Sequence, residues 1–571
     1  MLKKVVLITA VAALSCVCSQ AQTAMAKNYK EVGNSNPLSS CVFCADPTAF
    51  EYEGRVYVYG TNDHQQFIHN GKSGSNGYGN IRSLVVFSSA DMVNWQFHGT
   101  IDVGKVCSSW GGRFAASWAP SATWRKSAIG KDEFFLYFAN SGGSIGVLHA
   151  TSPVGPWRSP LTKPMIEQDT PGVRPCSWVF DPGVVIDDNG TGWIAFGGGD
   201  PQPTGSKLMP GNSRIAKLKP SMTSIDGSAV NLPAPYLFEA SELNMMNGRF
   251  VYTYNTSWSD RNDWGQYAKR GNNAAPSSCS MCYMVTDNPL DPDSWEYRGE
   301  YVPNEGNFGM GWGNNHTHLQ KFGDNYYLFY HSTLLESSMQ TGGSGYRSIG
   351  VDKLTVNEST QKLNKLTMTK AGVSAVCNLN PFELQQAETM ATSGGVSYED
   401  FTNINTTSYS TLGNDACRNL QVRMASGAWT MVRNVDFGEH GASAFTIRAK
   451  GSGTVRVRLG SKTATPVATL EFSSTGLEDH TIEVDPEKTR GVKSLYIIFS
   501  NTKDVQFDSW LFTEAESTGI DSRSADAQPA GTHRYYDLSG RRISLSGVKG
   551  KVVIEEFEDQ QGIRRVRKRM L

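Results

Sequence analysis

The chain has 571 residues, which is too long for one ordinary domain of about 100–200 residues. Only 19% of the residues are charged, whereas 11% are aromatic and 57 are glycine; this composition favours β-structure with many tight turns and excludes a coiled coil or a disordered chain. The formal net charge is −1, so no overall positive field exists to bind DNA, RNA or an anionic membrane, and nucleic acid is excluded as the main partner.

The first 26 residues have the pattern of a secretory signal peptide. Lys3 and Lys4 precede the apolar run VVLITAVAAL, and small residues follow, with cleavage expected after Ala21 or after Ala26. The run is too short for a membrane anchor. Cys16 follows Ala-Leu-Ser, which resembles a bacterial lipoprotein box and leaves lipid tethering as an alternative. We expect a protein without a transmembrane segment that is secreted, periplasmic or at the cell surface of a bacterium.

Eight of the ten cysteines follow this segment, and four of them form two Cys-x-x-Cys pairs. Zinc sites built from two such pairs place them about 15–20 residues apart, and these two pairs are much farther apart. No thioredoxin-like pattern surrounds either pair. Disulfides or buried free thiols are therefore favoured over zinc in an exported protein. The eight are Cys41, Cys44, Cys107, Cys176, Cys279, Cys282, Cys377 and Cys417.

A repeat runs through the first four hundred residues. Five segments, starting at Ala45, Ala116, Val179, Phe238 and Asn314, share an apolar strand, a turn with Gly, Asp or Asn, and an aromatic strand. Further short strands between them bring each repeat to four strands. Five repeats of about 60–75 residues are what a five-bladed β-propeller requires, and their order favours it over a β-sandwich with chance similarity.

Three carboxylates fall at equivalent places in these repeats. The first strand of each propeller blade lines the central channel, so residues near the strand starts converge at one mouth. Placing like charges close together adds no stability to a fold, so a catalytic role for these carboxylates is favoured over a structural one. Hydrolysis of a glycosidic bond needs a protonated carboxyl as acid and an ionised carboxylate as base, and a third can keep the acid protonated. The converging residues are Asp46, Trp118, Asp181, Glu239 and His316.

The motifs around these carboxylates resemble glycoside hydrolase family 43, five-bladed propeller enzymes that act on arabinose- and xylose-containing polysaccharides. The resemblance covers residues 35–375. Its ADP, FDP and FEAS motifs imply Asp46 as general base, Asp181 as modulator of the acid's pKa and Glu239 as general acid. Both aspartates precede proline, so turn capping is their alternative role. The family inverts the anomeric centre, and an inverting pair lies about 6.5–9.5 Å apart to admit water.

The same resemblance implies substrate-binding roles for Trp118, His316 and Arg347, in the SWAP, NH and GYR motifs. Trp118 is expected to be a sugar platform or a core residue. His316 is expected to contact the substrate or a calcium or sodium ion, with a core histidine as the alternative. Arg347 is expected to hydrogen-bond the substrate rather than to form a surface ion pair. Glu242 competes with Glu239 for the role of acid but lies farther along the strand.

Residues 380–516 read as a β-sandwich of about 130 residues. This segment resembles carbohydrate-binding module family 6 in an Ala-Glu start at Glu388, a Gly-x-Trp segment at Trp429 and a late Asp strand at Asp508. The structural calcium of that family implies Glu388 and Asp508 as metal ligands. Many members carry an acid where Gln386 stands, and this departure argues against the calcium.

Two features of the C-terminal half stay open. Trp429 and Trp510 are expected in the core rather than as sugar platforms, so a module that has lost sugar binding and braces the propeller is an alternative. Residues 517–571 form a polar linker and a tail whose YDLSGRR segment resembles the C-terminal segments of proteins exported by Bacteroidetes-type bacteria. The basic end RRVRKR is expected to be solvated.

The sequence therefore predicts an all-β protein with a signal peptide (1–26), a five-bladed β-propeller (27–379), a β-sandwich or jelly-roll domain (380–516) and a tail (517–571). We expect a monomeric, inverting glycosidase that releases α-L-arabinofuranosyl groups from arabinoxylan of the plant cell wall and needs no cofactor for its chemistry. A β-xylosidase is the main alternative; an endo-acting arabinanase, a sugar-binding propeller without catalysis and a structural surface protein are weaker ones.

Overall fold

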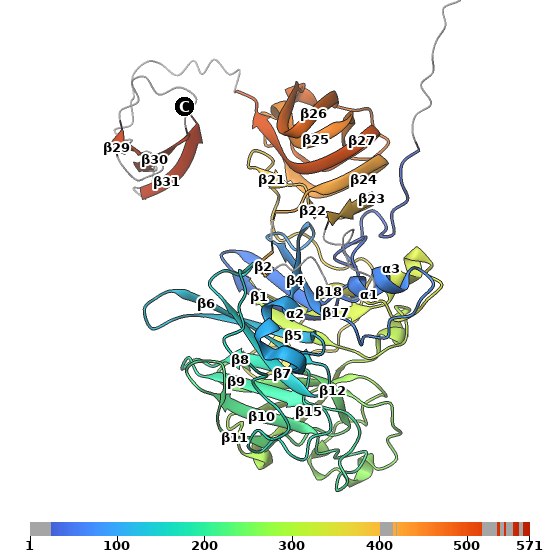
Figure 1. Cartoon of the computed structure of the whole chain (residues 1–571), viewed down its shortest axis with the longest axis vertical. Coiled ribbons are helices and arrows are strands. Elements are labelled where there is room, and N and C mark those ends of the chain that lie inside the picture. The colour runs from blue at the N-terminus through green and yellow to red at the C-terminus, as the bar shows by residue number, and fades with distance from the viewer. Residues whose placement is uncertain are drawn as a thin grey trace, which may run out of the picture. The chain divides into compact units, whose positions relative to one another are not determined.

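The computed structural model describes residues 24–399, 415–417 and 419–516, together with four short strands of the tail. By its internal contacts the chain divides into two compact units, Met1–Ala515 and Glu516–Leu571. The first unit contains both predicted domains, and nearly all its regular structure is β-strand (Figure 1). Cys16 and most of the predicted signal peptide lie outside the described residues.

Five antiparallel sheets follow one another along the chain and form the blades of the propeller. Each begins with an inner strand, and the inner strands β1, β5, β8, β12 and β16 neighbour one another in a closed ring. The strands are, blade by blade, β1 Ala45–Tyr52, β2 Arg55–Thr61, β3 Ser83–Ser89 and β4 Trp95–Asp102; β5 Trp118–Lys126, β6 Asp132–Asn140 and β7 Ser144–Ala150; β8 Gly183–Ile186, β9 Gly192–Gly197, β10 Ser213–Leu218 and β11 Ile225–Asn231; β12 Leu237–Met246, β13 Arg249–Thr256, β14 Met281–Thr286 and β15 Glu296–Val302; β16 Thr317–Phe322, β17 Asn325–Ser332 and β18 Ser348–Leu354.

Few helices accompany these strands. The α-helices are α1 Asp63–Asn70, α2 Val103–Val106 and α3 Leu334–Met339, and the six 3₁₀ helices of the described residues are η1 Ser108–Arg113, η2 Trp264–Gln266, η3 Ala268–Arg270, η4 Pro292–Ser294, η5 Glu305–Phe308 and η6 Pro486–Lys488. A small hairpin, β19 Val356–Asn357 and β20 Lys362–Leu363, follows blade 5.

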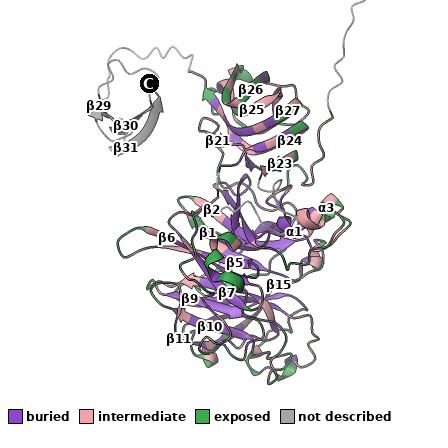
Figure 2. Cartoon of the chain, in the orientation of Figure 1, coloured by how far each residue is buried: buried purple, intermediate pink, exposed green. Residues whose placement is uncertain are grey.

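Apolar residues fill the space between each pair of adjacent blades. Five of the seven hydrophobic clusters of the described residues each join one blade to the next around the ring. The strands of the propeller are accordingly mostly buried (Figure 2). Because every blade buries its two faces against its neighbours, the aromatic and β-branched composition of these strands specifies the ring. One large residue from each cluster is Phe329, Tyr252, Phe134, Leu328 and Tyr137.

The prediction of four strands in every blade is wrong for blades 2 and 5, which have three in the described part of the chain. In blade 2, two isolated bridges to the segment 158–166 replace the fourth strand. In blade 5, the segment before β1 runs beside β18, where the N–H of Leu38 donates to the carbonyl of Ile349 and that of Cys44 to the carbonyl of Arg347. The start of the chain thus covers the open edge of the last blade and closes the ring.

A strained backbone recurs where the inner strands begin. Non-glycine residues rarely adopt a positive φ, yet four blades carry one at this place, and the strand pairing shifts beside three of them, as a β-bulge does. The bulge re-aims side chains and N–H groups towards the mouth of the channel. Glu239 and Trp118 lie one residue before this position. The four residues are Asp46 (φ 49°), Ala119 (φ 38°), Asp181 (φ 46°) and Ala240 (φ 62°).

The second domain is one set of long, bent antiparallel strands in the order β23-β24-β27-β25-β26, with β21 beside β27. Trp429 and Trp510 are buried in it, which confirms the prediction that they belong to the core. The strands are β21 Gln385–Gln386, β22 Thr389–Met390, β23 Thr392–Tyr398, β24 Val422–Asp436, β25 Ala442–Leu459, β26 Ala468–Glu483 and β27 Val492–Glu514.

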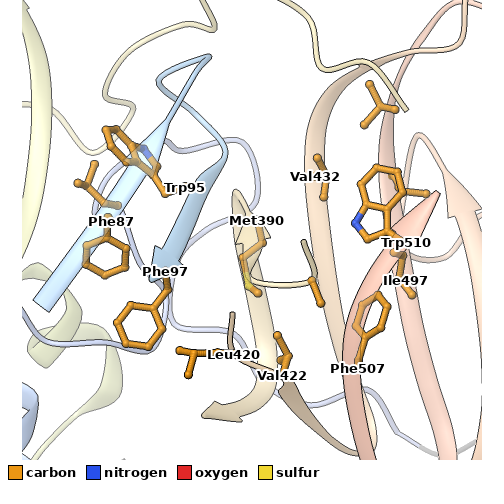
Figure 3. Packing of buried hydrophobic residues seen from close by; sticks show 14 of the residues in the cluster. Phe87, Trp95, Phe97, Met390, Leu420, Val422, Val432, Ile497, Phe507 and Trp510 are labelled. Atoms are coloured by element: carbon orange, nitrogen blue, oxygen red, sulfur yellow. The ribbon is translucent and has the colours of Figure 1, made fainter. Parts of the chain in front are cut away.

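The two domains share one hydrophobic core. Strand β22 belongs to the sheet of blade 1, where Met390 pairs with Trp95 of β4. Figure 3 shows Trp95 and its neighbours facing the apolar side chains of the sandwich, such as Leu420 and Trp510. Asn94 and Arg433 also exchange two hydrogen bonds across this junction, at 2.8 and 2.9 Å. The sandwich is therefore built onto blade 1 and is not tethered by a flexible linker.

The tail contributes a small sheet with the order β29-β28-β30-β31, from β28 Arg534–Tyr536, β29 Arg542–Ile543, β30 Val552–Glu558 and β31 Arg564–Met570. All eight cysteines after the signal segment are free thiols, five of them buried. No three His, Cys, Asp or Glu side chains within the described residues are grouped to hold a metal ion. No described helix has the length and apolar character that crossing a membrane would demand.

Candidate active site

A cavity of about 670 Å³ opens where the inner strands begin. All six residues that the sequence predicted for the propeller's site line it, although they come from different blades. The recurrent bulge and the convergence of the blades place them there. They are Asp46, Trp118, Asp181, Glu239, His316 and Arg347.

Asp46 is buried among groups that favour its ionised form. Thr61 donates a hydrogen bond to Oδ2 at 2.7 Å, and Nη1 of Arg347 donates to Oδ1 at 2.8 Å. His331 lies 3.1 Å from the same oxygen. Burial alone would raise the pKa of Asp46, but the positive charge of Arg347 and the contact with His331 outweigh it and hold this pKa well below the ordinary value. Asp46 is an anion at neutral pH.

Arg347 holds two carboxylates at once. Its Nε and Nη2 donate to the two oxygens of Asp63, both at 2.9 Å, while Nη1 reaches Asp46. The guanidinium carbon lies 4.9 Å from the ring centre of Tyr78. The bidentate pair with Asp63, the first residue of α1, fixes the guanidinium in place. Arg347 lines the cavity, and its guanidinium hydrogen bonds within the described residues go to Asp46 and Asp63.

Asp181 lies just before β8, at the position in blade 3 that corresponds to Asp46 in blade 1. Its Oδ2 accepts a hydrogen bond of 2.8 Å from the N–H of Ala240, the residue after Glu239. Burial and the negative charge of Asp46 raise the pKa of Asp181 to about 7, against the opposing effect of that hydrogen bond. Asp181 is thereby tied directly to the strand segment that carries Glu239.

Glu239 is half-buried at the start of β12. Burial and the charges of Asp181 and Asp46 raise its pKa well above the ordinary value. The surroundings of Glu239 therefore favour its protonated form, whereas those of Asp46 favour the ionised form. One protonated and one ionised carboxyl in one cavity are the two groups that hydrolysis of a glycosidic bond with inversion requires.

Glu242, the competing candidate, lies elsewhere. It is buried three residues farther along β12, and its Oε1 is 3.0 Å from Nδ1 of His318. Both residues line a separate cavity of about 280 Å³, which is bounded by later residues of the inner strands. Glu242 does not reach the cavity of Asp46 and Asp181.

His316 is buried but lines the cavity, with its Nδ1 3.7 Å from Oδ1 of Asp46. Burial lowers the pKa of His316 to about 4, although Asp46 acts in the opposite direction, so the ring is neutral at neutral pH. The neighbouring His331 bridges Asp46 to the blade 5 loop, because its Nε2 lies 2.6 Å from the carbonyl oxygen of Asn314.

Aromatic side chains form much of the cavity's wall. Trp118 donates its Nε1–H to the carbonyl of Tyr78 at 3.1 Å, which fixes the indole at the mouth. Three further tryptophans that line the cavity are unusually exposed: Trp178 at 36%, Trp258 at 48% and Trp312 at 66%. Exposed aromatic faces beside buried carboxyls suit a ligand with apolar ring faces and many hydroxyl groups, as sugars have.

Several of these residues were missed by the sequence analysis, and a signal for some of them existed. Because adjacent strands are antiparallel, the end of a blade's second strand returns to the mouth where its first strand begins. Asp63 and Trp258 directly follow the second strands of blades 1 and 4, and His331 lies at the end of that of blade 5. Trp178 and Trp312 lie in loops, where no periodicity marks them.

Burial raises the pKa of Glu388, one of the two predicted metal ligands of the sandwich, to about 8, and the charge of the other, Asp508, acts in the same direction. Glu388 accepts a hydrogen bond from the N–H of Leu420 at 2.6 Å through Oε1. Its Oε2, and Oε1 of Gln386, are buried and have no hydrogen-bond partner among the described residues. Asp508 is engaged by Asn419, at 3.0 Å from Oδ1. Two free buried oxygens on one short segment fit a hard cation such as calcium.

The protein is a five-bladed propeller, and tryptophans surround two carboxyl groups with opposite pKa shifts at the mouth of its channel. These features place it in the class of carbohydrate-cleaving enzymes. Residues 34–359 match the family described as Glycosyl hydrolases family 43, and residues 386–514 match Carbohydrate binding module (family 6). The chain belongs to glycosyl hydrolase family 43 and carries a family 6 module.

Related proteins share this likeness over 74% or more of their own length. An arabinoxylan arabinofuranohydrolase of Bacillus subtilis (strain 168) is 37% identical over 520 residues, which cover 88% of this chain and 97% of that protein. One from Paenibacillus polymyxa is 35% identical over 497 residues, covering 84% and 74%. The crystal structure of a family 43 arabinoxylan arabinofuranohydrolase from Bacillus subtilis, in complex with cellotetraose, superimposes with a TM-score of 0.74 at 36% identity, covering 86% of this chain and 99% of that one.

Proposed function

We propose that this protein hydrolyses arabinoxylan and releases α-L-arabinofuranosyl groups with inversion at the anomeric carbon. The observation that carries this proposal is that Asp46 and Glu239 line one cavity in surroundings that shift their pKa values in opposite directions, downward for Asp46 and upward for Glu239. The activity named for the two relatives supports the arabinosyl group over a xylosyl group.

The mechanism follows from the protonation states. Asp46 removes a proton from a water molecule as this water attacks the anomeric carbon, while Glu239 gives its proton to the departing oxygen of the polysaccharide. Arg347 and Thr61 keep Asp46 anionic until the attack. Asp181, through its hydrogen bond to the N–H of Ala240, holds the segment of the acid in place, and its negative charge favours the protonated form of Glu239.

The decisive experiment offers the enzyme 4-nitrophenyl α-L-arabinofuranoside, 4-nitrophenyl β-xyloside and arabinoxylan. We expect arabinose from the first and the last, and proton NMR of the first turnovers should show the β-anomer as the initial product. Xylose release with no arabinose would replace the proposal by a β-xylosidase. No release from any substrate, together with binding of the polysaccharide, would leave a sugar-binding propeller.

We also propose that the family 6 module binds a calcium ion through Glu388 and Asp508, with the amide oxygen of Gln386 as a further ligand. The two buried oxygens without partners support this proposal, whereas Arg448, whose Nε is 4.0 Å from Asp508, opposes it. Calcium should raise the melting temperature of the chelator-treated protein, and Glu388→Gln should abolish that rise. An unchanged melting temperature in calcium would refute the site.

We further propose that the protein is exported as a monomer and that its leader is cleaved after Ala21, not after Ala26. The contacts of Ala26 support the earlier site: its N–H donates to the carbonyl of Gly427 at 2.8 Å, and its carbonyl accepts from Nε1 of Trp429 at 2.9 Å. Cleavage after Ala26 would remove both bonds. N-terminal sequencing of the exported protein should begin at Gln22, and a lipidated Cys16 would refute this cleavage.

A further inference from the structure

A carboxyl group that the mechanism does not use lies in the wall of the active-site cavity. Glu305, the first residue of η5, is only 2% exposed, yet it lines the cavity. Its Oε2 has no hydrogen-bond partner within the part of the chain that the structure describes. Leaving a buried polar atom without a partner costs stability, so a ligand is the natural partner. Burial raises the pKa of Glu305 to about 9, so the neutral group can both donate and accept a hydrogen bond.

Glu305 is held rigidly beneath an exposed tryptophan. Asn304 caps η5 by accepting from the N–H of Gly306 at 2.9 Å, and it donates to the carbonyl of Gly313 at 2.7 Å. The ring of Trp312 lies on Gly306, where a Cβ would come within 2.2 Å of it. The same loop thus presents an aromatic face at the rim and a free carboxyl oxygen below it.

A chain of hydrogen bonds links this wall to the general acid. Glu239 is hydrogen-bonded by Asn255, whose Nδ2 is 3.4 Å from Sγ of Cys279. That thiol in turn donates to the carbonyl of Gly313, at 3.3 Å, next to Glu305. Since the acid protonates the oxygen that stays with the polysaccharide, the sugar beside it belongs to the polysaccharide chain.

We propose that Glu305 and Trp312 form a binding subsite for the polysaccharide chain, in which Trp312 stacks on a backbone sugar and the Glu305 carboxyl hydrogen-bonds one of its hydroxyls. This inference rests on the proposed function, because it assumes that the substrate is a branched polysaccharide cut at its side group. On this proposal, the wall formed by Glu305 and Trp312 contributes to the specificity of the enzyme for the polysaccharide.

The test compares a substrate that has a sugar chain with one that lacks it. Glu305→Met keeps the length of the side chain without its polar atoms, Glu305→Gln keeps a donor and an acceptor, and Trp312→Ala removes the ring. On arabinoxylo-oligosaccharides we expect Glu305→Met and Trp312→Ala to lower kcat/KM by about 10-fold, mainly through KM, and Glu305→Gln to keep most of it. On 4-nitrophenyl α-L-arabinofuranoside, which has no sugar chain, the losses should be clearly smaller than on the oligosaccharides.

A second readout separates binding from structural support. Because Glu305→Met removes a buried polar atom without a partner, it should raise the melting temperature while it weakens action on the oligosaccharide. A lowered melting temperature with equal losses on both substrates would overturn the subsite, and so would unchanged kinetics on both.

Binding can also be measured without turnover. The Glu239→Gln protein should bind xylo-oligosaccharides in calorimetry, and adding Glu305→Met should weaken the Kd by about 10-fold. If wild type releases no arabinose but this difference in Kd persists, the proposed reaction fails and the subsite stands. If wild type releases arabinose and the two Kd values are equal, the subsite fails alone.

Discussion

At the scale of single residues, Asp46 and Asp181 occupy equivalent positions in two blades, yet their pKa values shift in opposite directions. Asp46 and Asp181 both have a positive φ and precede a proline where an inner strand begins, but Asp46 is hydrogen-bonded by Arg347 and Thr61, whereas Asp181 accepts a hydrogen bond from the N–H of Ala240. Burial acts to raise the pKa of both, but the direct contacts of Arg347 and His331 with Asp46 outweigh it there, whereas at Asp181 burial and the charge of Asp46 prevail.

Removing the acid should cost most of the activity. We expect Glu239→Gln to lower kcat on arabinoxylan by about 10²- to 10⁴-fold, and less on the nitrophenyl substrate, whose leaving group needs little protonation. Glu242→Gln is the matched control, because this residue lies three positions farther along the same strand in a different cavity. It should keep near-wild-type kcat, and an equal loss in both variants would contradict the assignment of the acid.

Asp181 should control the alkaline limb of the pH profile. When Asp181 is ionised it raises the pKa of Glu239, so neutralising it lets Glu239 lose its proton at a lower pH. We expect Asp181→Asn to move the alkaline limb of kcat/KM down by about one pH unit or more. The acid limb, which follows Asp46, should not rise. A profile that only scales in height would show that Asp181 does not act on the acid.

At the scale of elements, bulges at the starts of three inner strands help to aim the site. Ala240 has φ 62° and donates its N–H to Asp181, so a conformation that most residues avoid is retained at a buried position. Ala119 has the same conformation in blade 2, and its N–H donates to Thr61 at 2.8 Å. Each bulge therefore ties the start of one blade to a polar group of its neighbour.

Because of this strain, we expect glycine to be tolerated better than valine at position 240, although glycine usually destabilises a strand. Glycine adopts a positive φ without cost, so Ala240→Gly should leave stability unchanged or raise it by up to about 1 kcal/mol. Ala240→Val should destabilise by more than about 2 kcal/mol and lower kcat, because a β-branched residue opposes this φ. Denaturant unfolding and kcat of the two variants test it; equal destabilisation by both would contradict the strain.

At the scale of the whole molecule, the sandwich and the propeller form one folding unit. Strand β22 extends the sheet of blade 1, and Trp95 and Trp510 belong to the same buried cluster from opposite sides of the junction. The alternative that the module braces the propeller therefore has structural support. Whether the module also binds sugar is a separate property.

The shared core predicts joint unfolding. Calorimetry of residues 24–516 should give one transition, and Trp95→Ala and Trp510→Ala should each lower its midpoint, since truncating a large buried aromatic costs about 3–5 kcal/mol. Two transitions, with each substitution affecting only its own domain, would contradict the single unit.

The sequence predicted those site residues that occupy equivalent positions in the repeated blades. The order of the strands, and the placement of Asp46, Asp181 and Glu239 at the starts of inner strands, were readable because period-two patterns and turn residues mark strands one by one. Glu305 and Trp312 were not readable, since they lie in a 3₁₀ helix and a loop outside the repeat, and they meet the cavity only in the folded chain.

The amino-acid sequence by itself determined the five-bladed propeller, the sandwich and the three carboxylates, because strand patterns and local motifs are encoded within short stretches of chain. Only the tertiary structure decided which carboxyl keeps its proton, since burial and the nearness of Arg347 depend on residues brought together from different blades. It also decided that the start of the chain closes blade 5 and that the sandwich shares a core with blade 1, because such contacts join segments far apart in the sequence and leave no local pattern.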